Sequence, residues 1–241
     1  MAVFAIADLH LPAAKKPMDI FGPHWKDHFQ RISADWIDRV TEDDTVLLPG
    51  DLSWAMHLEE AADDLDSIGK LPGKKILLRG NHDYWWSSIG RVRRMLAENM
   101  YALQNDSLLL DGRLYAGTRG WILPGADAAE DDLRIYARER MRLEMSLKHA
   151  RARDAGLPIP VMMHYPPLTD DNPGFSDLLE AYGVIDCVYG HLHGASIHGG
   201  VRGMRGSVRY HQVSCDGLGF KLYLLYPQAA AESFPAASAS E

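Results

Sequence analysis

Three short apolar runs in the first third of the chain, each followed at once by polar residues, predict buried strands. They are residues 3–7, 45–49 and 75–79. A continuous apolar run of this length is typical of a strand that is covered on both faces. Between these runs, residues 25–40 and 58–71 place apolar side chains at helical spacing. Strands that alternate with helices in this way predict βαβ units and parallel pairing.

The second half of the chain predicts more consecutive strands and fewer helices. Strands are expected at residues 108–110, 114–117, 159–163, 185–189, 208–214 and 220–225, and one long helix at residues 131–155. This order of elements predicts two packed sheets with helices on their outer faces. Residues 228–241 are small, polar and contain proline, so we expect a disordered tail after a single domain over residues 1–227.

The composition is that of a globular chain and excludes several classes of function. Hydrophobic residues make up 46% of the 241 residues, which is enough for a sizeable core. The net charge of −8 gives no general basic field, so we expect no stable binding of nucleic acid. No apolar stretch reaches the ~20 residues that cross a bilayer, and the N-terminus lacks the pattern of a signal peptide. We therefore expect no membrane association and a cytoplasmic location, while the oligomeric state stays open.

Five stretches place potential metal ligands directly after apolar runs. They are Asp8-x-His10, Gly50-Asp51, Gly80-Asn81-His82-Asp83, Met163-His164 and Gly190-His191-x-His193. The carboxyl ends of strands in a doubly wound sheet share one crevice, so these stretches can converge although they are far apart in the chain. Several imidazoles and carboxylates in one crevice are costly unless they are paired or bind a metal. The sequence therefore predicts a metal site.

The types of ligand narrow the choice of metal. Imidazole and carboxylate groups without thiolates suit manganese, iron or zinc, and they disfavour an all-oxygen calcium site. Seven candidate ligands exceed the three protein ligands of an ordinary catalytic zinc site, and a carboxylate such as Asp51 can bridge two ions. We therefore expect two divalent metal ions, with manganese as the first choice and iron or zinc as alternatives.

Taken in order, these blocks resemble the calcineurin-like metallophosphoesterase superfamily, whose pattern is D-x-H, G-D, G-N-H-[DE], H and G-H-x-H. Every block is present, in the same order, from Asp8 to His193. The resemblance implies an α/β fold, a four-layer α/β/β/α sandwich with two packed mixed sheets. It also implies how the ligands divide. Asp8, His10 and His193 would hold the first metal, Asn81, His164 and His191 the second, and Asp51 would bridge them.

The resemblance further implies a dinuclear, metal-dependent phosphoesterase. In such an enzyme a hydroxide that bridges the metals attacks the phosphorus of a phosphate ester directly. His82 and Asp51 would then be the catalytic residues. His82 would bind no metal and would face the substrate phosphate beside Asn81. If protonated, it would donate a proton to the departing alkoxide or stabilise the transition state.

One departure from the superfamily bears on the substrate. The Ser/Thr protein phosphatases of this superfamily read G-D-x-V-D-R-G after the bridging aspartate, whereas this chain reads GDLSWAM at residues 50–56. The aspartate that partners the catalytic histidine is therefore missing from that place, which disfavours a protein phosphatase. Asp83 is another candidate for that role. Residues 50–56, 81–86 and 117–121 look instead like a bacterial branch of predicted phosphohydrolases.

Three further residues are candidates for binding the substrate. Trp54 and Trp121 could stack on a base or ring, or could simply pack in the core. Arg119 could clamp a second phosphate, or could lie free on the surface. We expect a small organic phosphate or a nucleotide as the partner of the site. The alternatives are a phosphodiesterase or nucleotide pyrophosphatase of the same superfamily, or a non-catalytic metal-binding scaffold.

Overall fold

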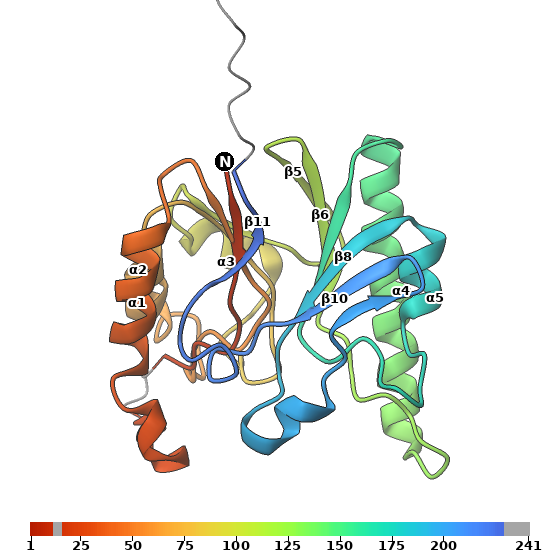
Figure 1. Cartoon of the computed structure of the whole chain (residues 1–241), viewed down its shortest axis with the longest axis horizontal. Helices are drawn as coiled ribbons and strands as arrows, with labels where there is room; N and C mark the ends of the chain where they lie inside the picture. Colours follow the sequence, from red (N-terminus) through yellow and green to blue (C-terminus); the bar gives the residue numbers. More distant parts are fainter. Residues whose placement is uncertain (12–15, 229–241) are drawn as a thin grey trace, which may run out of the picture.

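Two mixed β-sheets pack face to face, and helices cover the outer face of each sheet (Figure 1). The computed structural model describes residues 1–11 and 16–228 of the chain. The order of the layers is helix, sheet, sheet, helix, which confirms the expected α/β/β/α sandwich. The predicted tail at residues 228–241 lies, beyond residue 228, outside the described residues.

The first sheet has the strand order β11-β1-β2-β3-β4. Its strands are β1 (Val3–Ala5), β2 (Thr45–Leu48), β3 (Lys74–Leu77), β4 (Met100–Ala102) and β11 (Tyr223–Tyr226). Strands β1 to β4 run parallel, and β11 pairs antiparallel with β1 at the edge. The parallel arrangement places the carboxyl ends of β1, β2 and β3 at one edge of the sheet.

The second sheet has the strand order β5-β6-β7-β8-β10-β9. Its strands are β5 (Ser107–Leu110), β6 (Arg113–Thr118), β7 (Ile159–Met163), β8 (Val184–Tyr189), β9 (Gly203–Arg205) and β10 (Val208–Gln212). The four inner strands are parallel, and the outer strands β5 and β9 are antiparallel to their neighbours. The carboxyl ends of the inner strands therefore also lie at one edge.

Three hydrophobic clusters hold the layers together. One packs α1 (His28–Arg39), α2 (Ala62–Gly69) and α3 (Ile89–Met95) on the first sheet. A second packs α4 (Glu130–Arg153) and α5 (Ser176–Ala181) on the second sheet. The third fills the space between the sheets with side chains such as Leu47, Ile76, Met162 and Val188. Three short 3-10 helices, η1 (Met18–Phe21), η2 (Pro23–Trp25) and η3 (Gly194–Gly199), lie in the connections.

The predicted strands and longer helices are present, with shifts at their ends. The helix expected at residues 25–40 starts only at His28, because Pro23–Trp25 forms a separate 3-10 turn. Four short elements, α3, β4, α5 and β9, were not predicted. They are too short for a hydrophobic repeat to be recognised, and β9 exposes all three of its residues to solvent.

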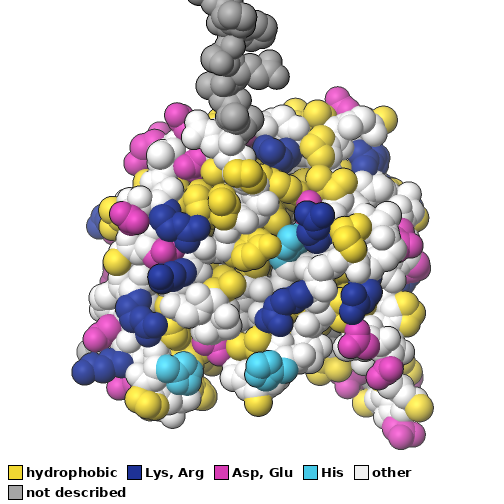
Figure 2. Space-filling model, viewed as in Figure 1, with side chains coloured by type: hydrophobic (Ala, Val, Ile, Leu, Met, Phe, Trp, Pro, Cys, Tyr) yellow, Lys and Arg dark blue, Asp and Glu magenta, His cyan; other side chains and the backbone are white. Residues whose placement is uncertain are grey.

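The molecule is seen along the edges of its sheets in Figure 2. Hydrophobic side chains gather near the centre of this face, and Lys and Arg side chains are spread around them rather than collected in one region. Among the helices of the described residues, none combines the length and the apolar composition needed to cross a bilayer.

Candidate metal centre

All the predicted ligand blocks meet at the edge where the parallel strands of both sheets end. Asp8 and His10 follow β1, Asp51 follows β2, Asn81 and His82 follow β3, His164 follows β7, and His191 and His193 follow β8. A backbone bridge between Ala7 and Ser214 joins the two sheets at this edge. The site is therefore built by both sheets.

The backbone at the ligands has an unusual conformation. Asp8, His10, Asp51 and His191 have φ angles of 64°, 45°, 55° and 72°. This left-handed region is uncommon for residues other than glycine, and such strain persists only where the surrounding structure holds it. Hydrogen bonds between the loops do so here: the Asp8 N–H donates to Gly50 O at 3.0 Å, and the His10 N–H to Asp51 O at 3.0 Å.

Two glycines allow the loops to approach closely. A Cβ on Gly190 would lie 2.6 Å from Asp8 Oδ2, and a Cβ on Gly80 would collide with Asp51. Glycine is therefore required beside the candidate ligands, because a larger residue would collide with them.

The first group of possible metal ligands is Asp8, His10 and His193. His10 Nε2 lies 3.3 Å from His193 Nε2, and His193 Nε2 lies 3.9 Å from Asp8 Oδ1. The other ring nitrogen of His193, Nδ1, is 3.0 Å from Asp216 Oδ1, so it carries the proton and leaves the lone pair of Nε2 free. Two imidazole nitrogens facing each other beside a buried carboxylate fit a cation between them.

The second group gathers around Asn81 and Asp51. Asn81 Oδ1 lies 2.6 Å from His164 Nε2 and 2.9 Å from His191 Nδ1. His164 Nδ1 lies 3.0 Å from Pro49 O, which accepts its proton and leaves Nε2 for a metal. Asp8, Asp51 and His164 also offer ligand atoms within 4.8 Å of one another.

Asp51 lies between the two groups. Its Oδ2 is 3.4 Å from His164 Nε2 and 3.9 Å from His10 Nε2. The carboxylate is almost fully buried, at 1% exposure. This is the placement that a ligand shared by two metals requires.

The buried carboxylates of the cluster favour a bound cation. Burial raises the pKa of Asp8 to about 6 and lowers the pKa values of His10 and His191 to about 3. Burial would lower the pKa of His164 as well, but Asp51 and Asp8 raise it to about 9. The buried carboxylates thus attract a cation to this point. A bound divalent metal meets the same need without a proton, so the donor set fits such ions.

Asp83 holds the loops that carry the ligands. Its buried carboxylate accepts hydrogen bonds from the backbone N–H groups of Gly80, Asp51, Leu52 and Ser53 at 2.7 to 3.2 Å. It also accepts one from Trp85 Nε1 at 2.9 Å. These contacts are with the backbone and with Trp85, so the idea that Asp83 orients the ring of His82 was wrong. Asp83 instead ties the Asp51 loop to the Asn81 loop.

Two residues that support the ligands were missed in the sequence. Asp216 holds His193 through Nδ1 and also accepts from the Gly194 N–H at 2.9 Å. His28, in α1, has Nε2 2.8 Å from Leu9 O, between Asp8 and His10. Asp216 could have been found, because it follows the predicted strand at residues 208–214 in the same way as the other acidic residues follow theirs.

His82 lies beside the ligands with its backbone tied to one of them. Its N–H donates to Asp51 Oδ1 at 2.8 Å. The ring centre lies 4.4 Å from Trp54 and 5.8 Å from His10. Burial lowers the pKa of His82, and Asp51 partly offsets that effect. The ring nitrogen Nδ1 has no hydrogen-bond partner in the described part of the chain.

A cavity of about 450 Å³ opens beside His82. Its lining joins His10, His82 and His193 to apolar side chains that include Met18, Phe21, Trp25 and Trp54. Trp54 stacks on His10, with ring centres 4.8 Å apart and an angle of 20° between the rings. The lining of the cavity therefore combines three histidine side chains with largely apolar ones.

The other candidate substrate residues lie elsewhere around the centre. Trp121 donates through Nε1 to Asp132 at 3.0 Å, and its ring lies 5.3 Å from that of Tyr165. It does not line the cavity beside His82. Arg119 lies 18% exposed, with Nη2 3.6 Å from Glu139 Oε1, so it is not a free surface residue. Trp85 and Trp86 are core residues.

Comparisons with known proteins are consistent with this geometry. A family model described as calcineurin-like phosphoesterase matches residues 1–195. Among solved structures, TT1561 of Thermus thermophilus is 14% identical, with a TM-score of 0.56 over 93% of this chain and 97% of that chain. The protein of unknown function AQ665 from Aquifex aeolicus is 15% identical, with a TM-score of 0.50 over 92% and 94%. Identities this low show a shared fold alone. No curated protein gives a significant match to the sequence.

Proposed function

The chain belongs to the calcineurin-like phosphoesterase family, whose members are phosphoesterase hydrolases that typically bind divalent metals, and from that premise we propose that it hydrolyses a small organic phosphate ester at a dinuclear centre. The observation that carries this proposal is the position of Asp51 between two groups of ligands. Asp8, His10 and His193 would hold one metal, and Asn81, His164 and His191 the other. Manganese is our first choice, with iron or zinc as alternatives.

Two bound cations would make water acidic enough to act as a nucleophile at neutral pH, and would neutralise charge on the phosphate. The protein supplies the rest. Pro49 and Asp216 hold two of the ligand imidazoles in the tautomer that binds metal. Asp83 fixes the loops of Asp51 and Asn81. Metals held in fixed positions by these residues would orient the phosphate before reaction, which is a large part of catalysis in phosphoryl transfer.

His82 is the residue we assign to the leaving group. It lies at the wall of the cavity and is tied to Asp51 through its backbone, so its ring is free to face the substrate. Burial favours the neutral ring, but a phosphate dianion beside it would favour the protonated form. A protonated His82 can donate its proton to the departing alkoxide.

The cavity beside His82 supports an organic leaving group. Trp25, Trp54 and Phe21 offer aromatic faces close to the ligands His10 and His193. Such walls favour an apolar or ring-shaped group over a small, highly charged one. A nucleotide remains within this class. A diester or a nucleotide-linked diphosphate as substrate is the alternative within the same chemistry.

An assay of aryl phosphates tests this proposal. Purified protein supplied with manganese should hydrolyse an aryl phosphate monoester, and a preference for the matching diester would favour the phosphodiesterase alternative. Protein that is purified without metal and hydrolyses neither ester under added manganese would instead be a binding scaffold. The presence of all seven candidate ligands and of His82 argues against that outcome.

A further inference from the structure

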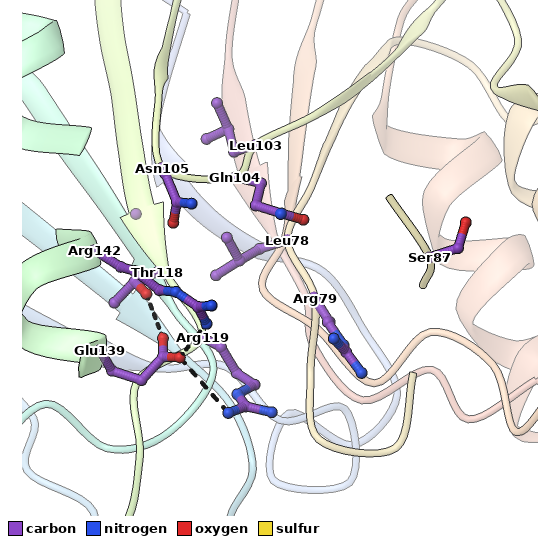
Figure 3. A pocket seen from close by; sticks show the side chains of 11 residues that line it. Leu78, Arg79, Ser87, Leu103, Gln104, Asn105, Thr118, Arg119, Glu139 and Arg142 are labelled. Atoms are coloured by element: carbon purple, nitrogen blue, oxygen red, sulfur yellow. Dashed lines mark hydrogen bonds and ion pairs between the residues drawn. The ribbon is translucent and has the colours of Figure 1, made fainter. Parts of the chain in front are cut away.

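A second pocket, of about 100 Å³, is lined by residues from both sheets and has none of the candidate metal ligands in its lining (Figure 3). Arg79 follows β3 in the first sheet, and Arg119 follows β6 in the second. Helix α4 adds Arg142 and Glu139. Figure 3 shows Glu139 reaching toward Arg119 and Thr118, while Arg79 lies on the far side of Arg119 from Glu139. We call the cavity that these four charged residues line the arginine pocket.

The arginine pocket has three guanidinium groups and one carboxylate. Glu139 is fully buried, and both of its carboxylate oxygens already accept hydrogen bonds. Its Oε2 accepts from Thr118 Oγ1 at 2.6 Å, and its Oε1 accepts from Arg142 Nη1 at 2.7 Å. Arg119 Nη2 is farther from Oε1, at 3.6 Å. One shared carboxylate therefore leaves positive charge without a counterion.

Several donors in the pocket have no acceptor. Arg79 Nε, Arg119 Nε and Ser87 Oγ are buried atoms that lack a hydrogen-bond partner among the described residues, and all three residues line the pocket. Leaving such donors unpaired is costly, and more so when the group is charged. Burial lowers the pKa of Arg119, Glu139 raises it, and Arg79 and Arg142 lower it further. Arginine stays charged under these conditions, so a bound anion would offset the repulsion between these guanidinium groups.

We propose that the arginine pocket binds one oxyanion of the size of phosphate. The volume corresponds to roughly three water molecules, which is room for a single phosphoryl group. Guanidinium groups bind phosphate oxygens through paired N–H donors, and Arg79 and Arg119 each have a buried Nε without a partner among the described residues. This site shares no residue with the proposed metal centre, and its occupancy can be measured without any enzymatic activity.

The pocket is connected to the metal centre through the backbone. Arg79 lies two residues before Asn81. The carbonyl oxygen of Arg119 accepts from the N–H groups of His164 and Tyr165 at 3.1 and 2.9 Å. An anion here could be the second phosphoryl group of a substrate or free phosphate. Both present the same oxygens to the arginines.

Equilibrium dialysis with radiolabelled inorganic phosphate tests the site on the protein as purified. Wild type should bind one phosphate in addition to any at the metal centre, and Arg79→Gln should weaken that site at least about tenfold, because a charge-assisted hydrogen bond is lost. The matched control is Arg134→Gln, since Arg134 is also an arginine, is 75% exposed on α4 and pairs with Asp131. Unchanged phosphate binding in Arg79→Gln would overturn the proposal.

Melting temperatures separate a binding role from a purely structural one. In phosphate-free buffer, Arg79→Gln should melt no lower than wild type, because it removes a half-buried guanidinium group whose Nε has no partner among the described residues. Added phosphate should then raise the melting temperature of wild type more than that of the variant. A variant that melts lower than wild type by the same amount in both buffers would show that Arg79 is only structural, against the proposal.

Kinetics distinguish the two sources of the anion. If the pocket holds a second phosphoryl group, Arg79→Gln raises the KM of an aryl diphosphate more than that of an aryl monophosphate. If it holds free phosphate, the variant weakens inhibition by added phosphate for both substrates alike. Either result supports the site. Equal effects of phosphate and equal KM ratios in wild type and variant would count against it.

Discussion

Replacement of His82 and replacement of Asp51 should differ in their effect on the metals. The metals should stay bound without His82 and should be lost without Asp51. His82→Ala should keep its metals and lose turnover by about 10² to 10⁴-fold, since it removes only a proton donor. The control is His57→Ala, because His57 is exposed and outside the cavity. Elemental content and turnover of an aryl phosphate check both points. Full activity in His82→Ala would contradict the role given to this ring.

Asp216 should affect the affinity for the first metal, because it forms a hydrogen bond with His193. Asp216→Asn weakens the acceptor that holds His193 Nδ1, so the first metal should bind about 10 to 100-fold less tightly. The second metal, on the side of His164, should be little affected. Metal titration of the variant measures both affinities. Two unchanged affinities would mean that Asp216 does not orient His193 for binding.

The sequence predicted the residues of the centre better than their supports. The candidate residues from Asp8 to His193 can be recognised because each block follows an apolar strand, and the structure brings them together. Asp216 follows a strand in the same way but lies outside the recognised blocks. The role of Asp83 could not be predicted, because backbone N–H groups from a loop distant in sequence are its partners.

At the scale of elements, the loops after β2 and β3 form one unit through Asp83. An asparagine at this position offers one acceptor oxygen in place of two, and would leave at least one buried N–H unpaired. Asp83→Asn should therefore lower the free energy of unfolding by about 2 to 3 kcal/mol and reduce the metal content. Urea unfolding and elemental content measure these effects. A variant as stable as wild type would show that the loops hold without this carboxylate.

Asp186 joins an inner strand of the second sheet to the edge strand β11 of the first. In β8, it lies 2.7 Å from His211 Nε2 in β10 and accepts from Tyr226 OH in β11 at 2.6 Å. Burial raises the pKa of Asp186, but the hydrogen bonds from His211 and Tyr226 outweigh it and hold the pKa below its ordinary value. Its contribution to stability is therefore present above about pH 4, the unfolded value, and is lost as the pH falls through the folded value.

The lowered pKa of Asp186 predicts that the difference in unfolding free energy between wild type and Asp186→Asn depends on pH. At pH 7 the variant should be less stable by about 2 kcal/mol, because charged hydrogen bonds are lost. The gap should narrow as the pH falls below about 4, because the carboxylate takes up a proton first in the unfolded chain and, at lower pH, in the folded one. Urea unfolding at about pH 7 and about pH 3, on either side of that value, measures it. An equal gap at both values would mean that the charge of Asp186 does not matter.

The element order was readable from the sequence wherever elements were long or fully buried. Strands such as β2 and β7, with every residue buried, stand out as continuous apolar runs. Helix α4 stands out by length, and a charged sequence of this kind is typical of a solvated face. Glu139 is fully buried there, because Thr118 and Arg142 satisfy its oxygens. Such pairing depends on the tertiary structure and leaves no mark in the local pattern.

For the whole molecule, the metal centre lies where two sheets meet. Asp8 and His10 come from the first sheet, and His193 from the second. Metals held by residues of both sheets would bind the folded chain far better than the unfolded one. Removal of metal by a chelator should therefore lower the melting temperature, by an amount that corresponds to about 4 kcal/mol when the free metal was at about 1,000 times its dissociation constant. An unchanged melting temperature would place the metals outside this junction.

The number of metals per chain is the most direct measure of a dinuclear centre bridged by Asp51. Wild-type protein supplied with manganese and freed of excess metal should hold two ions per chain. Asp51→Ala should lose affinity for both, because the carboxylate lies between the two groups of ligands. Elemental analysis of the two proteins, prepared side by side, gives the answer. One ion per chain in wild type, or two ions retained in Asp51→Ala, would contradict the dinuclear centre.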